Sequence, residues 1–211
     1  MAKKQGLFVT LEGPDGSGKS TQQALLARHL RGFGYFVVET REPGGSPTAE
    51  RIRKMLLDPE LKALRPAAEL LLFEAARAQH VADTIVPAMA KGAVVLCDRF
   101  TDSTMAYQGA GRSVEAKAVA WLNRFASLGM APDLTLLYDL GSKQGLERAR
   151  QAKGRRDRME EADLAFHARV RARFLRLAKE APRRVKLLRV AGRKPLAVAE
   201  DGLKLILERL P

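Results

Sequence analysis

Cysteine is nearly absent from this sequence, since Cys97 is the only one among 211 residues. A lone cysteine cannot form an internal disulfide and is typical of a reducing compartment, so we expect a cytoplasmic protein. No apolar run approaches the ~18 residues of a membrane span, and the first residues lack the apolar segment of a signal peptide. We therefore expect no membrane partner.

Internal repeats, low-complexity tracts and linkers long enough to separate two domains are also missing. The hydrophobic fraction of 46% and the charged fraction of 29% are those of a globular protein with enough chain to bury a full core. These observations predict one domain over residues 1–211.

Acidic residues are scarce relative to basic ones, 24 against 37, which gives a net charge of +13. Such a charge suits a protein that binds nucleic acid or a membrane surface, or an enzyme whose substrates are polyanions. Only the placement of the arginines can separate these classes.

A glycine-rich stretch near the start fits the phosphate-binding pattern G-x-x-x-x-G-K-[ST]. An apolar segment at 6–12 precedes it and a helical pattern at 21–30 follows, which disfavours the alternative of an ordinary glycine turn. Glycines let backbone N–H groups surround a phosphate, Lys19 can reach the β- and γ-phosphates, and Ser20 can bind Mg²⁺. The expected ATP-binding residues are Gly13, Pro14, Asp15, Gly16, Ser17, Gly18, Lys19 and Ser20.

Strand and helix patterns alternate along the rest of the chain. Strands are expected at 6–12, 36–40, 93–97, 134–139 and 185–190. Helices are expected at 21–30, 47–57, 67–80 with a further helical stretch to 91, 101–107, 114–128, 144–151, 162–180 and 195–210, with a loop at 109–111. This order predicts a three-layer α/β P-loop NTPase fold, a five-stranded parallel sheet with helices on both faces. Ligands bind such sheets beyond the carboxyl ends of the strands.

Charged side chains are expected at that edge. Asp98 ends an apolar strand, where P-loop proteins place the carboxylate that helps hold Mg²⁺ through water; a helix cap or an arginine partner is the alternative. Arg41, Arg53, Arg77 and Arg99 lie on separate elements, and guanidiniums that converge on one cleft suit a second phosphate. The Asn-Lys-x-Asp element of a GTPase is missing, and a DNA-binding ATPase would carry its basic residues on an exposed face. The pattern favours phosphate transfer from a triphosphate to a monophosphate.

Six ordered motifs, at 13–20, 40–45, 72–77, 98–100, 103–109 and 132–135, resemble the bacterial thymidylate kinases. The resemblance covers essentially the whole chain. It implies a homodimer that makes dTDP from dTMP and ATP with Mg²⁺, in dTTP synthesis, with no nucleic-acid partner. A kinase for another monophosphate or a free nucleoside remains an alternative, as does a regulatory ATPase that binds nucleic acid.

The resemblance also implies roles for single residues. Phe73 would stack on thymine, and Arg77 would donate to a thymine carbonyl, with Thr104 and Gln108 at the base edge. Asp15 would face the acceptor sugar, and Tyr107 would occupy the place of a ribose 2′-hydroxyl. The dTMP-binding set is Asp15, Arg41, Glu42, Arg53, Phe73, Arg77, Arg99, Ser103, Thr104, Tyr107 and Gln108. Without the resemblance, Phe73 would be assigned to the core, Thr104 to a cap and Tyr107 to packing.

Metal and catalytic residues follow from the same resemblance. Ser20, Asp98 and, through water, Glu42 would hold Mg²⁺. Gly16 stands where eukaryotic relatives carry an arginine, so the basic lid at about 150–160 would supply charge in the transition state. The catalytic candidates are Asp15, Lys19, Arg99, Arg150, Lys153, Arg155 and Arg156, with Arg158 as a further lid arginine. The lid is a residue longer than in some relatives, and no single residue stands out as the finger.

Other residues are expected to be structural. Trp121 is predicted to lie in the core, and Cys97 to be a small buried hydrophobe. His29, His80 and His167 lie on separate predicted helices without metal-ligand spacing, so surface or helix-end positions are expected.

Overall fold

Five parallel strands form the centre of the fold in the residues that the computed structural model describes, 6–61, 63–153, 158–159 and 161–210. The strands are β1 (Leu7–Glu12), β2 (Val37–Arg41), β3 (Val94–Asp98), β4 (Leu134–Asp139) and β5 (Val185–Arg189), in the spatial order β2-β3-β1-β4-β5. The predicted five-stranded parallel sheet is confirmed.

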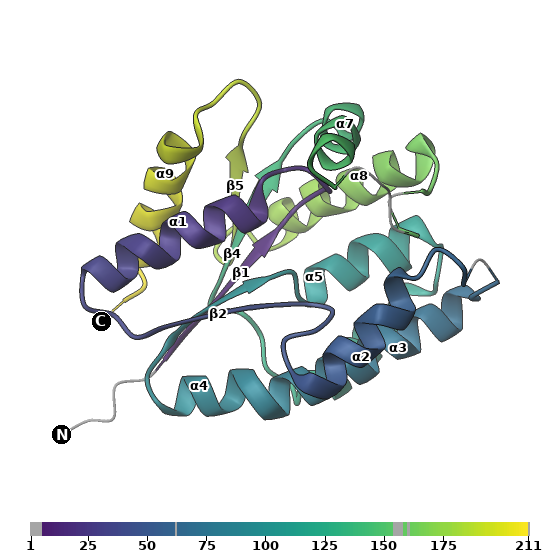
Figure 1. The fold of residues 1–211 in the computed structure, drawn as a ribbon, viewed down its shortest axis with the longest axis horizontal. Coiled ribbons are helices and arrows are strands. Elements are labelled where there is room, and N and C mark those ends of the chain that lie inside the picture. Colours follow the sequence, from purple (N-terminus) through teal and green to yellow (C-terminus); the bar gives the residue numbers. More distant parts are fainter. Residues whose placement is uncertain (1–5, 62, 154–157, 160, 211) are drawn as a thin grey trace.

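Helices cover both faces of this sheet (Figure 1). One face carries α1 (Lys19–Gly32) and α9 (Pro195–Leu207), which pack against each other. The opposite face carries α4 (Val86–Ala90), α5 (Thr101–Thr104) and α8 (Leu164–Glu180). The remaining helices are α2 (Pro47–Leu57), α3 (Pro66–His80), α6 (Ala116–Ala126) and α7 (Ser142–Lys153).

The core lies between the sheet and these two helical layers. Leu26 of α1, Leu136 of β4 and Ile206 of α9 belong to one buried apolar cluster. Phe8 and Cys97 belong to a second cluster on the other face. Because both faces are covered, the inner strands are continuous apolar runs, and burial of each large side chain stabilises the fold by roughly 2 kcal/mol. The prediction that Cys97 is a buried hydrophobe is confirmed, since its side chain is inaccessible.

Two helical segments differ from their predicted form. The loop predicted at 109–111 is wrong, because π-helical turns continue from Met105 to Gly111 (η2, Met105–Gly111). Gly111 packs so closely that a Cβ there would collide with the ring of Phe166, so this glycine serves packing. A second π-helical segment, η1 (Val81–Ile85), joins α3 to α4 and carries the helix through to Pro87.

Trp121 lies elsewhere than predicted, and two histidines that lie at helix ends, as expected, are buried. Trp121 is 64% exposed, because α6 turns it away from the core, so its assignment to the core is wrong. His80 and His167 are buried rather than superficial. His80 belongs to a polar network with Thr40 and Glu42.

The strand register places the expected ligand-binding groups side by side. Leu11 of β1 and Arg41 of β2 both pair with Asp98 of β3, so the P-loop, which follows β1, begins next to Asp98. Among the described residues, no helix is both long enough and apolar enough to cross a membrane.

Candidate active site

The P-loop connects β1 to α1 in a conformation that needs glycine. Gly16 has a φ of +71°, and a Cβ at this position would collide with the backbone carbonyl of Gly145 in α7. Gly13 has a φ of +139°, and a Cβ at this position would collide with the backbone carbonyl of Tyr138. Glycine is therefore required at these two positions both because other backbone atoms approach closely and because the backbone dihedral angles favour glycine.

Lys19 begins α1, and its ammonium bends back over the loop. Its Nζ donates to the carbonyl oxygens of Gly13 at 3.1 Å and Pro14 at 2.9 Å. Burial and the nearby Arg99 lower the pKa of Lys19 to about 8, although neighbouring carboxylates raise it. A buried ammonium at this position gains from a further anion, so the loop is electrostatically prepared for phosphate.

The hydroxyl of Ser20 donates to Asp98 Oδ2 at 2.8 Å. Asp98 Oδ1 is buried and accepts no hydrogen bond from the residues that the structure describes. A metal-bound water would satisfy this oxygen, because Mg²⁺ keeps several waters and takes few protein ligands. The hydroxyl and the free acceptor therefore fit a magnesium ion held mainly by phosphates, and the described residues hold no cluster of three acidic, histidine or cysteine ligands.

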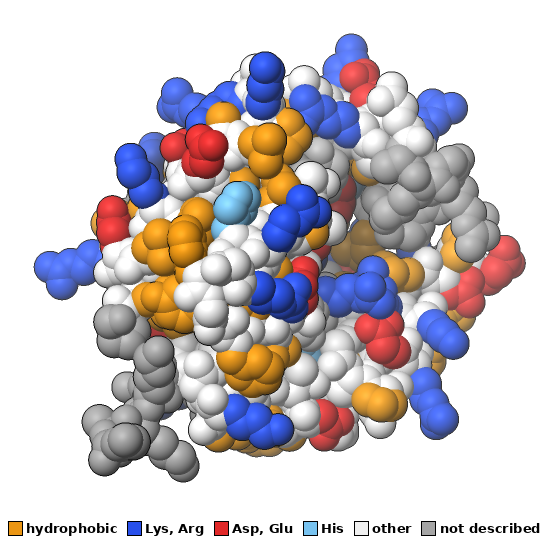
Figure 2. Space-filling model, turned by 60° about the vertical axis from the view of Figure 1, so that its left-hand side comes forward, with side chains coloured by type: hydrophobic (Ala, Val, Ile, Leu, Met, Phe, Trp, Pro, Cys, Tyr) orange, Lys and Arg blue, Asp and Glu red, His pale blue; other side chains and the backbone are white. Residues whose placement is uncertain are grey.

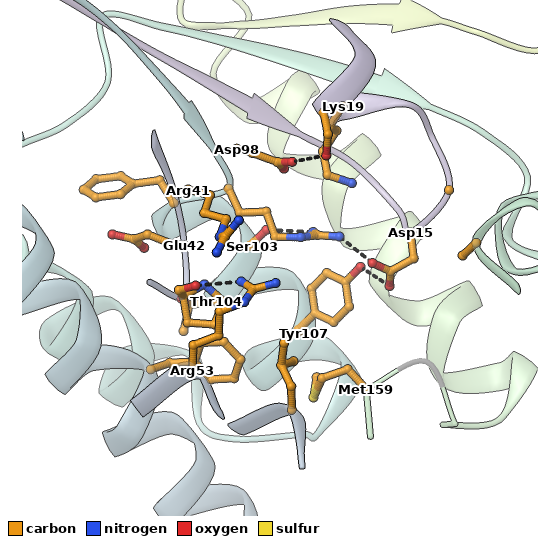
Figure 3. A pocket seen from close by; sticks show the side chains of 18 of the residues that line it. Asp15, Lys19, Arg41, Glu42, Arg53, Asp98, Ser103, Thr104, Tyr107 and Met159 are labelled. Carbon is orange, nitrogen blue, oxygen red and sulfur yellow. Dashed lines mark hydrogen bonds and ion pairs between the residues drawn. The ribbon is translucent and has the colours of Figure 1, made fainter. Parts of the chain in front are cut away.

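Asp15 and Tyr107 point toward each other in the cavity (Figure 3), and with Arg99 they form a compact polar cluster. Arg99 Nη2 donates to Asp15 Oδ1 at 2.6 Å, and the Tyr107 hydroxyl donates to Asp15 Oδ2 at 2.8 Å. The Arg99 guanidinium also lies 4.9 Å from the centre of the Tyr107 ring. Burial raises the pKa of Asp15, but Arg99, Lys19 and the Tyr107 hydrogen bond outweigh it and lower the pKa to about 2. Asp15 is therefore ionised at all working pH values.

Glu12 is a site residue that the sequence reasoning missed. It ends β1 and is inaccessible to solvent. Its carboxylate accepts the Phe100 N–H at 2.7 Å and the Ser103 hydroxyl at 2.6 Å, and the same hydroxyl accepts from Arg99 at 3.1 Å. Burial and the nearby Asp102 raise its pKa to about 7. A glutamate next to the P-loop in a buried strand was the available signal.

Arg77 is buried beneath the site with a partner on each guanidinium nitrogen. It donates to Glu42 at 2.8 Å, to Glu74 at 2.9 Å and to the Thr104 hydroxyl at 2.9 Å. It also donates to Asn123 Oδ1. Burial lowers the pKa of Arg77, but the two glutamates raise it above the ordinary value. The Thr104 hydroxyl, which accepts from Arg77, keeps its own proton available.

Glu42 and His80 support the loop that follows β2. The peptide bond between Glu42 and Pro43 is cis. His80 lies 3.0 Å from Glu42 Oε1 and 2.6 Å from the hydroxyl of Thr40. Arg53 donates to the Pro43 carbonyl at 2.6 Å. This network fixes the loop from beneath, so the buried histidine is a structural part of the site.

One cavity of about 530 Å³ joins the P-loop to the far end of this cluster. Phe73, on α3, is half-buried and lines the cavity. The predicted residues that line it are Asp15, Gly16, Gly18, Lys19, Ser20, Arg41, Glu42, Arg53, Phe73, Arg77, Asp98, Arg99, Ser103, Thr104, Tyr107 and Gln108. Gly13, Pro14 and Ser17 complete the loop. The lining residues Arg148 and Met159 were not predicted, because no spacing in the sequence marks them.

The predicted lid residues lie in different parts of the structure. Arg150 is exposed on α7. Arg155, Arg156 and the side chain of Lys153 lie outside the described residues. Arg158 is buried and donates to Glu69 at 2.5 Å and to the Leu56 carbonyl at 3.0 Å.

The parallel sheet, the P-loop and the serine–aspartate pair define a P-loop nucleotide-binding kinase fold. The sequence profile of the thymidylate kinase family matches residues 11–200. The chain is 54% identical over 186 residues to the thymidylate kinase of Pseudomonas putida (strain GB-1), which covers 88% of each chain. It is 51% identical over 205 residues to that of Pseudomonas savastanoi pv. phaseolicola, which covers 97% of this chain and 96% of the relative.

A solved structure supports the same family assignment. The crystal structure of the thymidylate kinase from Ehrlichia chaffeensis superposes with a TM-score of 0.80 at 32% identity, over 96% of this chain and 99% of that chain. The chain belongs to the thymidylate kinase family. It is accordingly an enzyme, an ATP-using kinase.

Proposed function

We propose that this enzyme transfers the γ-phosphoryl group of ATP to the phosphate of dTMP, with Mg²⁺, and so supplies dTDP for dTTP synthesis. The observation that carries the proposal is the single cavity that is lined both by the P-loop lysine and by Phe73. Arg99 lines the same cavity and is bound to Asp15 of the P-loop. The cavity can therefore hold a triphosphate and a monophosphate with their phosphates adjacent.

The donor end would bind ATP through the P-loop residues 13–20. Lys19 would move its ammonium from the Gly13 and Pro14 carbonyls to the β- and γ-phosphates. Ser20 and Asp98 would hold the metal, and Glu42 is a more distant candidate because both of its oxygens are already engaged. When bound, the metal neutralises charge on the transferring phosphoryl group.

The acceptor phosphate would bind the guanidiniums of Arg99 and Arg53, with Arg41 in support. Arg99 is half-buried and keeps its charge at any working pH, while Arg41 is exposed and paired with Glu50 at 3.1 Å. Each guanidinium can bind a phosphate bidentately. Ser103 fixes Arg99 from beneath by accepting from Nη1.

The nucleoside of the acceptor would lie over the far end of the cavity. Phe73 would stack on the base, and Thr104 and Gln108 would bind its polar edge, with Arg77 holding Thr104. Each guanidinium nitrogen of Arg77 already has a partner within the protein, so Arg77 would donate to a base carbonyl only by exchanging one of these partners. Tyr107 is fixed by Asp15 at 2.8 Å, so its ring would exclude a ribose 2′-hydroxyl. The proposal thus includes a preference for deoxyribose.

The reaction needs no strong general base, because the acceptor oxygen of a monophosphate is already an anion. Asp15 could not act as one, since its pKa of about 2 makes it a poor proton acceptor. Catalysis would consist of positioning and of charge neutralisation by Lys19, Arg99 and a lid arginine or lysine. Arg150, Lys153, Arg155 and Arg156 are the candidates for the lid residue, and lid closure would exclude competing water.

A homodimer in the cytoplasm, with residues 1–211 as a single domain, completes the proposal. Trp121 and Phe125 stack at 5.5 Å on the outer face of α6 and are 64% and 69% exposed. Leu128, which is 71% exposed, follows them. Such a continuous apolar face suits burial against a second copy.

Nucleic acid is not a proposed partner. On the face that Figure 2 displays, Lys and Arg side chains stand mostly apart, with acidic side chains among them, rather than in one continuous stripe. A hollow on this face has hydrophobic side chains at its floor and basic ones near its rim. Several arginines of α8 are paired with acidic groups, such as Arg171 with Asp139 at 2.7 Å. Part of the positive charge is thus neutralised by ion pairs within the fold.

An assay of the protein with Mg-ATP against a panel of nucleoside monophosphates tests the proposed function. ADP should form rapidly with dTMP, more slowly with dUMP, and hardly at all with ribonucleotides. The preference for dTMP over dUMP should stay below about a thousandfold, because one methyl group in a pocket contributes roughly 1–3 kcal/mol. Faster turnover of another monophosphate, or hydrolysis stimulated by DNA instead, would refute the assignment.

A further inference from the structure

Glu69, in the first turn of α3, is a buried carboxylate that the proposed chemistry does not use. It accepts hydrogen bonds from three side chains that are distant from it in sequence, two of them at η2. Gln108 Nε2 donates to Oε1 at 2.9 Å, Arg112 Nε donates to Oε1 at 3.2 Å, and Arg158 Nη1 donates to Oε2 at 2.5 Å. Burial alone would raise the pKa of Glu69, but these hydrogen bonds and the two arginine charges lower it below the ordinary value.

An ionised carboxylate can only accept hydrogen bonds, which fixes the direction of the Gln108 amide. The amide nitrogen must face Glu69, so the amide oxygen must point the other way. Gln108 lines the cavity, and Oε1 has no donor among the described residues. Gln108 therefore offers a hydrogen-bond acceptor to whatever fills this end of the cavity.

A pyrimidine base can form a hydrogen bond with this acceptor only through a donor of its own. The hydrogen-bonding edge of thymine has one donor, N3–H, between two carbonyl oxygens, whereas N3 of cytosine is an acceptor. We propose that Glu69 is a positioning residue for base specificity, which holds Gln108 with its oxygen toward the acceptor base and so selects a base with N3–H against one without it. This inference rests on the proposed function, since it assumes that the acceptor base occupies this end.

Arg112 and Arg158 hold the carboxylate in place. Arg158 is itself buried, and its Nε donates to the Leu56 carbonyl of α2 at 3.0 Å. Two cations on one anion keep Glu69 ionised and restrict its rotation, so the amide of Gln108 cannot lower its energy by turning over. Glu69 acts on the base only through Gln108.

The test compares dTMP with 5-methyl-dCMP, two acceptors that differ only at C4 and in the proton on N3. The measured quantity is the ratio of kcat/KM for the two acceptors at saturating Mg-ATP. In the Glu69→Gln protein, residue 69 can present either an oxygen or an amino group, so Gln108 loses its fixed direction. We expect the ratio to fall by about tenfold or more, mainly through a lower kcat/KM for dTMP, with the KM for ATP unchanged.

Two further proteins separate this role from general destabilisation. Arg184→Gln removes a comparable partly buried ion pair, to Asp102 at 2.6 Å, outside the cavity, and should leave the ratio within about twofold. In a Gln108→Ala background, Glu69→Gln should change the ratio no further, because Glu69 acts through the amide. Should Glu69→Gln fail to fold, Glu69→Gln/Arg158→Met removes the buried cation that was left unpaired, and the same ratio is measured.

The outcomes are distinct. An unchanged ratio of kcat/KM in a folded Glu69→Gln protein overturns the inference and leaves the proposed function intact. The same holds if Glu69→Gln lowers the ratio equally in the parent protein and in the Gln108→Ala protein. A parent protein that phosphorylates neither nucleotide overturns the proposed function, and the inference with it.

Discussion

Arg99 and Asp15 connect the two halves of the cavity, with Arg99 Nη2 lying 2.6 Å from Asp15 Oδ1. Asp15 belongs to the P-loop, and Arg99 follows β3 with a φ of +74°. The left-handed backbone of Arg99 is rare for a residue with a side chain and is held by the surrounding structure. It aims the guanidinium across the cavity at the P-loop, so the group proposed to hold the acceptor is anchored on the loop proposed to hold the donor.

Arg99→Ala should impair the use of dTMP far more than the binding of ATP. The acceptor phosphate would lose a half-buried charge-assisted contact, which costs roughly 3 kcal/mol, so kcat/KM for dTMP should fall about 100-fold. Steady-state kinetics with dTMP varied, and a binding titration with a non-hydrolysable ATP analogue, measure the two effects. Arg171→Ala, which removes an arginine paired with Asp139 outside the cavity, is the control. Equal losses for both nucleotides would contradict the assignment of Arg99 to the acceptor.

Glu12 should make the stability of the fold depend on pH. Its pKa is about 7 in the folded protein, against an ordinary value of 4.5, so the folded state keeps a proton that the unfolded chain loses between these values. Stability should therefore fall as pH rises from 4.5 through 7, by up to ~3 kcal/mol, and the loss is complete above pH 7. The Asp15 carboxyl, with a pKa of about 2, titrates below this window.

Urea unfolding at pH 5 and pH 8 measures this effect. Glu12→Gln resembles the protonated carboxyl and cannot ionise, so its stability should change less between these pH values than that of the parent protein. The histidines are the same in both proteins, and their contribution cancels in the comparison. An identical change in both proteins would show that Glu12 does not titrate in this range.

Gly16→Ala should lower the free energy of unfolding much more than an alanine substitution at another glycine with positive φ. Gly34 has a φ of +82° and nothing within 4 Å of an added Cβ, so Gly34→Ala should destabilise by about 1 kcal/mol, for the backbone alone. Gly16→Ala adds a collision with the carbonyl of Gly145, which is backbone and cannot turn aside. We expect a cost of about 3 kcal/mol or more in urea unfolding, with loss of ATP binding. Equal costs at both positions would mean that α7 simply moves away.

The sequence was sufficient for the parts of this protein that depend on local pattern. Apolar runs separated by helical periodicity predicted all the strands, and the P-loop glycines predicted a phosphate site, because these signals lie in adjacent residues. The helix at 47–57 was predicted with its observed bounds, since Pro47 fits a first turn and Asp58-Pro59 ends it.

Long-range packing was the part that the sequence could not supply. Trp121 is apolar and sits in a helical pattern, yet which face of α6 meets the rest of the fold depends on tertiary contacts. The glycines at 109 and 111 predicted a loop. Their segment is helical instead, and Gly111 is needed for packing against the ring of Phe166, which lies 55 residues away in sequence. Glu69 gave no signal at all, since Gln108 and Arg158 come to it only in the folded chain.

The exposed aromatic face of α6 predicts how the protein associates. Trp121 and Phe125 stack nearly parallel, at 11° between ring planes, and present two large apolar surfaces to solvent. Aromatic residues at the centre of an interface commonly contribute 2 kcal/mol or more, so Trp121→Glu should weaken dimerisation by about 30-fold or more. Phe125→Glu should act similarly, because a charge would be desolvated in the same contact.

Sedimentation equilibrium over a range of protein concentrations measures this change. Phe33→Glu is the matched control, because Phe33 is 60% exposed but follows α1, away from α6, and its replacement should leave the association constant unchanged. Circular dichroism should show each variant folded, since none of these side chains is buried in the described chain. If Trp121→Glu and Phe33→Glu associate alike, the α6 face is not the dimer interface, and its apolar residues need a different partner.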